Sequence, residues 1–476
     1  MTTTGCAGLT VSLAESLAFA RLSGDFNPLH VDAVTARRLQ FGTTVVHGMH
    51  LFLRALDLLA AQDLFVRHAP RTLSATFNNP VLTDEVFDLR VSIDLSRVRI
   101  SGETAGRPAL TGTIDLLPSL AAPALVEDAE FAPTNSRVSH FPPTAIEGTV
   151  PLRLSSKLLA EIFPALARLG AASWIAELLA TTHIVGMRCP GMDSIFSGFR
   201  LSRASDSSNP SGSMHFRVTG TEARFRLARM QVAGACFTGT VDTFFRSPPV
   251  PQRAMKDIAA VVSVDAFVGH RVLVVGGSRG LGELTAKICA AGGADVTITY
   301  ARGNVDAERV CEEARALDRT CRAYPLDVSI DGMTNAPEWL ARAHFSHVYF
   351  FATPHISKGS GRWDSQLFNR FVSIYVTAFA ALVEHVMSGH RGEPGSVNFL
   401  YPSSIFVTRP EAGFAEYAVA KAAGEALCSQ ILRRSDVRVA APRLPRLRTD
   451  QTSSLSDTSA VDAFPVILDV VRNLHS

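Results

Sequence analysis

Three polar side chains of the kind that acid–base catalysis uses lie within six residues of one another, in the segment SGDFNPLH. They are Asp25, Asn27 and His30. Adding water to an activated double bond needs a base that takes a proton from water and an acid that protonates carbon. Asp25 and His30 could share this work on one water that Asn27 orients. Pro28 would stiffen the loop on which the three groups converge.

A helix start downstream could complete the same chemistry. The segment FGTTVVHGM places Gly48 near the beginning of a long apolar run, from Val45 to Gln62. The first N–H groups of a helix have no partner within it, so they can stabilise negative charge that develops on a thioester oxygen. We expect Gly48 to be such a donor. The alternative for the whole region is a capped turn, in which Asp25 and Asn27 bond the backbone and His30 is a packed or surface ring.

A second set of reactive side chains lies near the other end of the sequence, in YPSSIFVTRPEAGFAEYAVAKAAGEAL. Tyr417 and Lys421 are four residues apart, which places them on one face of a helix. A lysine ammonium near a phenol lowers the pKa of the phenol, so Tyr417 could exchange protons near neutral pH. Ser404, thirteen residues before Tyr417, is expected at the end of a strand, where it could hold a substrate carbonyl or hydroxyl.

A glycine-rich turn precedes this set and predicts a dinucleotide site. The buried strand RVLVV leads into Gly276, Gly280 and Gly282, and a helix and a second strand follow. Glycine permits the tight turn and lets a pyrophosphate approach the helix N-terminus. The same turn contains Ser278, Arg279 and Leu281, which we also expect to contact the cofactor.

The residues around this turn favour NADP(H) over NAD(H). No acidic residue ends the second strand, whereas Arg279 lies in the turn and Arg302 follows the strand. Arginines at these positions suit a 2′-phosphate, although they could instead be solvated surface residues. Asp327, after the third strand, could meet the adenine edge or could cap a helix.

Composition excludes several classes of protein. The chain has 476 residues, of which 47% are hydrophobic and 19% charged, and its net charge of +2 argues against a dedicated nucleic-acid binder. The seven cysteines are odd in number and form no CxxC, so the sequence predicts neither a disulfide framework nor a zinc site. A reducing cytoplasm fits best. The most apolar run contains charged residues and is too short for a bilayer, so we expect no membrane span.

The elements that position these residues fall into three segments. Residues 1–135 read as helices followed by short alternating strands, residues 136–255 repeat that order, and residues 265–476 alternate buried strands with helices. The last pattern predicts a doubly wound parallel sheet. Several arginines fall on expected strands of the middle segment: Arg200, Arg217, Arg224, Arg226 and Arg229. They could meet CoA phosphates or an acidic carrier protein, or form a solvated sheet face.

The first segment resembles a known hydratase family. The run F-A-x-L-S-G-D-x-N-P-L-H-x-D, together with the H-G-M helix start, is similar to the MaoC-type, (R)-specific enoyl-CoA hydratase motif of hot-dog folds. The resemblance implies Asp25 and His30 as catalytic residues, Asn27 as their support, and an acyl thioester as substrate. The middle segment lacks the motif but keeps CPGMDSIFSGFRL, which resembles a strand in hot-dog enzymes. We therefore expect an α+β double hot-dog with one catalytic half and one degenerate half.

The third segment resembles the short-chain dehydrogenase/reductase family, with its α/β Rossmann fold. The resemblance implies Ser404, Tyr417 and Lys421 as the catalytic set, with Tyr417 moving the proton and a nicotinamide moving the hydride. Thr449 matches a later cofactor-binding position. The sequence departs from the family where Phe350–Thr353 replaces an Asn–Asn–Ala–Gly stretch. It departs again where Ser373 is the expected counterpart of a helix asparagine in the proton relay.

Together these features predict a bifunctional enzyme of acyl-thioester metabolism. One part would interconvert 2-enoyl and (R)-3-hydroxyacyl thioesters, and the other would interconvert 3-hydroxyacyl and 3-oxoacyl thioesters with NADP(H). The substrate would be an acyl-CoA or an acyl-carrier-protein thioester, and a homodimer is expected. Two alternatives stay open. One is a hydratase with a nucleotide-binding but weakly active reductase domain, and the other is a non-catalytic acyl-binding scaffold.

Overall fold

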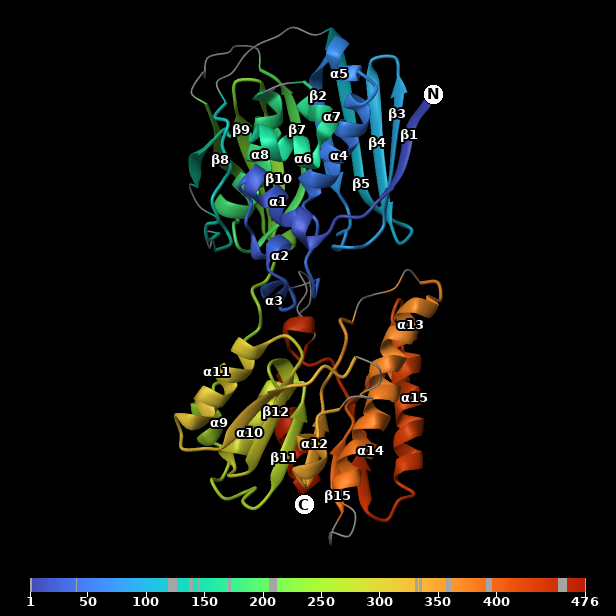
Figure 1. Cartoon of the computed structure of the whole chain (residues 1–476). Coiled ribbons are helices and arrows are strands. Elements are labelled where there is room, and N and C mark those ends of the chain that lie inside the picture. The colour runs from blue at the N-terminus through green and yellow to red at the C-terminus, as the bar shows by residue number, and fades with distance from the viewer. Residues whose placement is uncertain are drawn as a thin grey trace. The chain divides into compact units, whose positions relative to one another are not determined.

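A computed structural model of the chain describes residues 2–39, 41–118, 126–136, 140–143, 146–169, 173–204, 212–329, 333, 336–356, 359, 361–390, 396–452 and 460–475. The chain forms two compact units, the first ending at Pro248 and the second beginning at Pro249. Each unit has its own sheet and its own hydrophobic core (Figure 1).

The first unit is built on one ten-stranded antiparallel sheet. One half runs in the order β1 (Thr2–Leu9), β3 (Phe87–Asp94), β4 (Arg97–Thr104), β5 (Arg107–Pro118) and β2 (His68–Phe77). The other half continues with β7 (Ser194–Arg203), β10 (Phe237–Phe245), β9 (Leu227–Ala233), β8 (Ser213–Glu222) and β6 (Glu147–Pro151). The halves join where β2 pairs with β7, so the sheet passes without a break from one repeat to the next.

The helices of the first unit lie on one face of this sheet. Each half contributes a central helix, α4 (Gly48–Ala60) and α8 (Ser173–His183), and α8 continues as a π-helix, η1 (Ile184–Arg188). Figure 1 shows both central helices in front of the strands, with α1 (Leu13–Ser23) beside α8. Alternate strand residues point toward these helices, as the burial of every second residue in β4 shows.

One hydrophobic core fills the space between helices and sheet in both halves. Phe52 of α4 meets Phe199 of β7 edge to face, with ring centroids 5.2 Å apart. The aromatic contact joins the first half to the second, because the two residues come from different repeats. The predicted double hot-dog, with a helix on a curved antiparallel sheet in each half, is confirmed.

The second unit is a six-stranded parallel sheet. Its order is β13 (Cys321–Pro325), β12 (Asp295–Tyr300), β11 (Arg271–Val275), β14 (His347–Phe350), β15 (Val397–Leu400) and β17 (Val437–Ala440). In chain order this is 3-2-1-4-5-6, the order of a Rossmann sheet, as the alternating strands and helices predicted.

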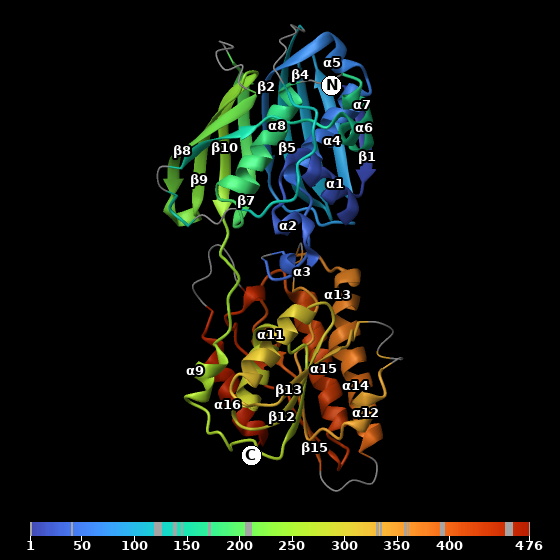
Figure 2. The ribbon, with the colours of Figure 1, turned by 60° about the vertical axis from the view of Figure 1, so that its left-hand side comes forward.

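Helices cover both faces of this sheet, as Figure 2 shows. The first core contains α10 (Gly280–Ala291), α11 (Asn304–Arg315) and α16 (Ala463–His475). The second contains α14 (Phe379–Gly389) and α15 (Ala415–Ile431). Strand β11 serves both, because Val272 and Val274 face the first core while Leu273 and Val275 face the second. Burial on both faces explains why this strand reads as an unbroken apolar run.

One helical run among the described residues, Ser365–Gly389, is long and apolar enough to cross a membrane by length and composition alone. Half of its most apolar window is buried inside the protein. Its buried residues include Phe371, Tyr375 and Phe379, which belong to the second core of the Rossmann unit. The run Val45–Gln62, for which the sequence predicted a helix that does not span a membrane, contains α4, most of which is buried.

Candidate active sites

The loop after α1 brings the predicted hydratase residues together. Gly24 ends α1 with a left-handed backbone (φ +77°), which turns the chain sharply into Asp25. Asn27 caps the short helix α2 (Pro28–Val31), and His30 lies within that helix. Asp25, His30 and His47 approach so closely that one nitrogen or carboxylate oxygen from each lies within 4.8 Å of the others.

The Asp25 carboxylate is almost fully buried, with 2% of the residue exposed. One of its oxygens accepts a hydrogen bond from the Thr182 hydroxyl at 2.6 Å, and the other accepts one from the Asn27 N–H at 3.2 Å. Burial raises the pKa of Asp25, whereas the charge of His30 and these two hydrogen bonds partly oppose the rise. A buried carboxylate with a raised pKa is a better proton acceptor than one in water.

His30 is oriented by one bond to the backbone. Its Nδ1 lies 2.7 Å from the carbonyl oxygen of Val45. A carbonyl only accepts, so Nδ1 carries the hydrogen and Nε2 is left for the site. Burial lowers the pKa of His30, while the charge of Asp25 and the Val45 bond raise it.

His47 lies directly against His30 and stays neutral. The two rings are stacked with centroids 3.8 Å apart, and His47 Nε2 lies 3.0 Å from the backbone oxygen of Asp25. Burial, followed by the charge of His30, holds the pKa of His47 well below its usual range. Burial lowers the pKa of both rings, and that of His47 more strongly, so His30 is the more basic of the stacked pair.

Asn27 holds the loop in place. Its side-chain amide donates to the carbonyl oxygen of Gly191 at 2.9 Å and to the Ser194 hydroxyl at 3.1 Å, and its oxygen accepts from the Leu29 N–H at 3.0 Å. Gly191 and Ser194 belong to the segment CPGMDSIFSGFRL, which the sequence assigned to a degenerate half. This segment fixes the loop that carries Asp25 and His30.

Two residues of the second half contact Asp25, and neither was predicted from the sequence. Thr182 supplies the hydroxyl described above from the last turn of α8, and Gly186 packs against the carboxylate from η1. A Cβ atom at Gly186 would overlap the Asp25 carboxylate, so only glycine fits there. No local motif marks either residue, because Thr182 and Asp25 are 157 positions apart.

Gly48 begins α4, as predicted, with His47 as the residue before it. A Cβ atom at Gly48 would lie 2.8 Å from the ring of Phe77, at the end of β2. Glycine is therefore required by this packing, and the backbone N–H at the helix start stays a donor of the kind an oxyanion needs.

Replacing Thr182 with Val should make hydration more sensitive to acid. The variant keeps the shape of the side chain but removes the donor to Asp25, so the pKa of Asp25 rises further. Hydration needs the ionised carboxylate, so its acid limb moves to higher pH. A hydrogen bond to a charged group contributes about 1.5–3 kcal/mol, so turnover on the acidic side should fall roughly 10- to 100-fold. The measurement is kcat against pH with crotonyl-CoA.

Thr181→Val is the matched control. Thr181 is fully buried on the same helix, but its hydroxyl donates to the Leu178 carbonyl oxygen of α8 itself. This variant should leave the pH profile in place. A Thr182→Val profile that coincides with that of the wild type would show that the hydroxyl does not tune Asp25.

The glycine turn of the second unit joins β11 to α10 with the geometry that a dinucleotide requires. Gly276 has φ +80°, and a Cβ there would lie 2.9 Å from the backbone nitrogen of Ala352. A Cβ at Gly282 would overlap the Gly276 carbonyl oxygen, so this glycine allows helix and strand to pack closely. At Gly280, φ is +59° and nothing lies within 4 Å of the Cβ position, which leaves space at the start of a 12-residue helix. These residues fit a pyrophosphate.

The other predicted cofactor residues follow the strands of this sheet. Arg302 is exposed just after β12, and Ser278 is buried within the glycine turn. The Asp327 carboxylate accepts from the N–H of Ser329 at 2.9 Å and from its hydroxyl at 2.6 Å, a local turn of the capping type. Thr449 is buried after β18 (Arg443–Leu444), and its N–H donates to the Thr452 hydroxyl.

Ser404, Tyr417 and Lys421 lie near one another. Tyr417 and Lys421 are on α15, and Ser404 ends the short strand β16 (Ser403–Ser404). A hydrogen bond with Ser404 lowers the pKa of Tyr417, but burial has the larger effect and raises it. The expectation that Lys421 lowers this pKa is wrong for this structure, because desolvation of the phenol outweighs any stabilisation of the phenolate.

Lys421 is held by groups other than Tyr417. Its Nζ donates to the Pro402 carbonyl oxygen at 2.7 Å and lies 3.7 Å from the ring centroid of Tyr375. Burial lowers the pKa of Lys421 to about 7. The expected relay position, Ser373, is exposed and donates to the Arg370 carbonyl oxygen of its own helix. The π-helix η4 (Ser373–Ala378) presents Tyr375, and not Ser373, to Lys421.

Comparison with known proteins finds one family match in each of the two units. Residues 3–105 match the family described as MaoC like domain, and residues 270–460 match the family described as short chain dehydrogenase. The peroxisomal hydratase-dehydrogenase-epimerase of Saccharomyces cerevisiae is 32% identical over 77 residues, which is 16% of this chain. The chain thus spans only 8% of that relative's length.

Solved structures of short-chain dehydrogenases are also similar to part of the chain. One from Burkholderia cenocepacia, in complex with NADP, is 24% identical with a TM-score of 0.40, and covers 44% of this chain and 92% of its own. Another from Serratia marcescens is 19% identical with a TM-score of 0.39 and the same coverage. By its family matches, the chain carries a MaoC-like domain and a short-chain dehydrogenase domain in one polypeptide.

Proposed function

We propose that the protein is a bifunctional enzyme that interconverts 2-enoyl and (R)-3-hydroxyacyl thioesters in its first unit and 3-hydroxyacyl and 3-oxoacyl thioesters in its second. The observation that carries the proposal is the proximity of Asp25 and His30, whose titratable atoms lie within 4.8 Å of each other, in a MaoC-like domain. Thr182 orients the carboxylate of Asp25, and the Val45 carbonyl oxygen orients the ring of His30. The product of hydration is a hydroxyl compound that a dehydrogenase domain of the same chain can oxidise, and reduction supplies the substrate for dehydration.

In hydration, Asp25 and His30 hold one water between the carboxylate and Nε2. The carboxylate takes a proton as the water oxygen bonds to C3 of the enoyl thioester, and the Asp25–His30 pair returns a proton to C2. Negative charge that develops on the thioester oxygen meets the N–H groups at the start of α4, of which Gly48 supplies one. Asn27 acts as a positioning residue, because its amide is bonded to Gly191 and Ser194.

In the second unit, the glycine turn and the start of α10 would hold the pyrophosphate of a nicotinamide cofactor, which supplies hydride transfer when bound. Ser404 holds the substrate oxygen, and Tyr417 moves the proton at that oxygen. The raised pKa of Tyr417 keeps the phenol protonated near neutral pH. A protonated phenol is a general acid, so the site suits reduction of the 3-oxo group, followed by dehydration in the first unit.

The cofactor is NADP(H), and Arg302 should select it. Replacing Arg302 with Gln should raise the KM for NADPH by roughly 10- to 100-fold and leave that for NADH unchanged, because only the 2′-phosphate gains a charge-assisted hydrogen bond. The control is Arg315→Gln, because Arg315 is also exposed but lies at the far end of α11, after Arg302. Equal KM values for Arg302→Gln and the wild type would mean that Arg302 is a solvated surface residue.

A coupled assay tests the whole proposal. Crotonyl-CoA is added with NADP+ or with NAD+, and absorbance is followed at both the enoyl and the reduced-nicotinamide bands. The proposal expects loss of the enoyl band together with formation of reduced nicotinamide, faster with NADP+. Loss of the enoyl band alone would leave only the hydratase activity. If neither absorbance band changes, both catalytic assignments fail for short substrates.

A hydratase with a slow reductase domain is the second candidate, and the surroundings of Lys421 favour it. The ammonium faces the rings of Tyr375 and Tyr401, at 3.7 and 4.9 Å from their centroids, instead of a polar relay. A lysine with a pKa of about 7 is only partly charged at neutral pH, so it stabilises a phenolate weakly. The coupled assay separates the two candidates by the rate at the nicotinamide band.

A further inference from the structure

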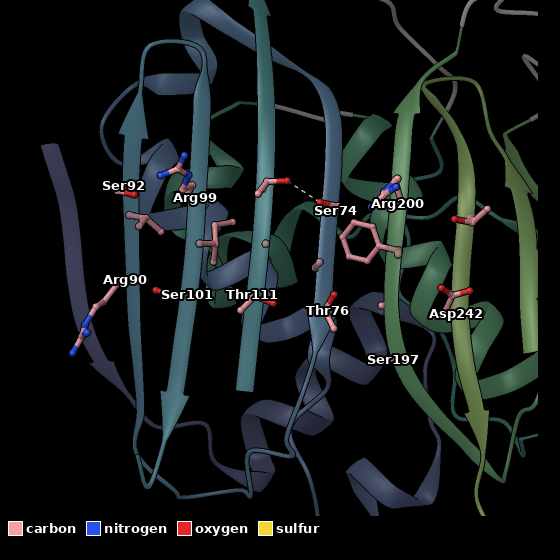
Figure 3. Close-up of a pocket in the computed structure, with 18 of the residues that line it drawn as sticks. Ser74, Thr76, Arg90, Ser92, Arg99, Ser101, Thr111, Ser197, Arg200 and Asp242 are labelled. Carbon is pink, nitrogen blue, oxygen red and sulfur yellow. Dashed lines mark hydrogen bonds between the residues drawn. The ribbon is translucent and has the colours of Figure 1, made fainter. Parts of the chain in front are cut away.

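A hollow of about 860 Å³ lies on the face of the ten-stranded sheet opposite the helices (Figure 3). Side chains on this face alternate with the buried residues of the core, and most of those lining the hollow are hydroxyls or arginines. Ser74, Thr76, Ser101 and Thr111 form part of its floor. Small side chains on neighbouring strands leave the depression, because nothing on them reaches far from the sheet.

Strand pairing arranges the charges in a regular way. One row across the sheet consists of Ser92, Arg99, Thr113, Ser74, Arg200 and Thr240. Arg99 and Arg200 therefore flank two hydroxyl residues and stand three strand spacings apart, about 14 Å. We name the whole hollow the arginine-flanked trough, because Arg99 on β4 and Arg200 on β7 stand on either side of its floor.

The trough is positively charged. Its lining contains Arg90, Arg99, Arg200 and Arg229 and a single carboxylate, Asp242. That carboxylate is bonded to Arg229 by two contacts of 2.7 and 3.0 Å. A second copy of the same face would bring arginines against arginines, so the charge favours an acidic occupant over self-association.

The width of the trough fits an occupant that is an α-helix. An α-helix with its side chains is about 10–12 Å across, so a helix lying along β5 and β2 fits between two arginines about 14 Å apart. Carboxylates on both flanks of such a helix reach Arg99 on one side and Arg200 on the other. The floor of short hydroxyl side chains lets the helix approach the sheet closely.

The trough also ends near the hydratase site. Thr76 lies in the trough, and the next residue of β2, Phe77, packs against Gly48. On β7, Ser197 lies in the trough, and Ser194 of the same strand is bonded to Asn27. A partner docked here is beside the strand ends that support the loop of Asp25 and His30.

We propose that the arginine-flanked trough docks an acidic helix of a carrier protein that bears the acyl thioester. The identity of the cargo rests on the proposed function, whereas the docking rests on the trough alone. Of the five arginines that the sequence singled out on the middle segment, Arg200 and Arg229 line the trough. Arg217 instead pairs with Glu147, and Arg224 and Arg226 stack on phenylalanine rings.

Binding without turnover is the first test. The full chain is immobilised, and holo acyl carrier protein is passed over it at low and at physiological salt. We expect saturable binding that weakens with salt, and a Kd that rises by about 10-fold or more in Arg99→Glu and in Arg200→Glu. Arg224→Glu makes the same change of net charge at an exposed arginine outside the trough, and should bind as the wild type does. Absence of saturable binding to the wild type would overturn the proposal.

Turnover is the second test, and it separates a carrier protein from free CoA. The KM for crotonyl-carrier protein should rise at least about 10-fold more than the KM for crotonyl-CoA in each trough variant. An equal rise for both substrates would mean that the trough binds the phosphates of CoA, and the carrier-protein proposal would fail. The chain could also show salt-sensitive binding that depends on the two arginines and yet hydrate neither substrate. That result would support the docking and contradict the proposed function.

Discussion

Replacing Asp25 with Asn should lower kcat for hydration of crotonyl-CoA by about 10²–10⁴-fold, because the amide cannot take a proton from water. The same change should leave the protein at least as stable. Burial raises the pKa of Asp25, so folding favours its neutral form, and the ionised carboxylate costs stability above that pKa. Asn removes that cost and can still accept the Asn27 N–H.

Two measurements on this variant therefore separate catalysis from stability. Turnover should fall, whereas the Tm at neutral pH should be equal to or higher than that of the wild type. The Tm advantage should shrink as pH falls, because Asp25 itself becomes neutral there. Asp32→Asn is the matched control, because Asp32 caps α3 (Ala33–Ala36) through bonds that Asn also makes. Retention of more than about a tenth of wild-type turnover in Asp25→Asn would remove this residue from the chemistry.

Replacing Tyr417 with Phe should abolish hydride transfer and spare hydration. The phenol is the group that we propose moves the proton at the substrate oxygen, so its loss should cost about 10²–10⁴-fold in the rate of acetoacetyl-CoA reduction. Tyr401→Phe serves as the control, because the Tyr401 hydroxyl is buried without a hydrogen-bond partner among the described residues. Both variants should hydrate crotonyl-CoA as the wild type does.

The wild-type pH profile gives an independent check on Tyr417. Because burial raises its pKa, the phenol stays protonated through neutral pH. Loss of the phenol proton should therefore slow reduction as pH rises through this pKa, whereas oxidation of a 3-hydroxyacyl thioester should rise over the same range. An oxidation rate that is already maximal at neutral pH would mean that the phenol ionises more easily than its burial implies.

Local patterns predicted the elements well. The apolar run before Gln62 gave α4, and the strand–glycine–helix sequence gave β11 and α10, because each depends on residues close together in the chain. The loop of Asp25, Asn27 and His30 was predictable for the same reason: a cap, a proline and a left-handed glycine turn act within a few positions.

Contacts between distant segments were not predictable. Thr182 and Gly186 reach Asp25 only because the ten-stranded sheet brings two repeats together. Burial, which decides the pKa of Tyr417, depends on the packing of α15 against other elements and leaves no mark on its own sequence. Likewise, the family resemblance placed Ser373 where a relay asparagine is usual, but nothing in the sequence showed that a π-helix brings Tyr375 to Lys421.

The bond between the Asn27 amide and the Gly191 carbonyl oxygen has a consequence for biosynthesis. Its partners are 164 positions apart. A ribosome releases the loop of Asp25 and His30 long before it makes the residues that fix that loop. The hydratase centre is therefore completed late, when β7 joins β2, and a nascent chain ending within the first repeat carries the motif without the support that sets its geometry.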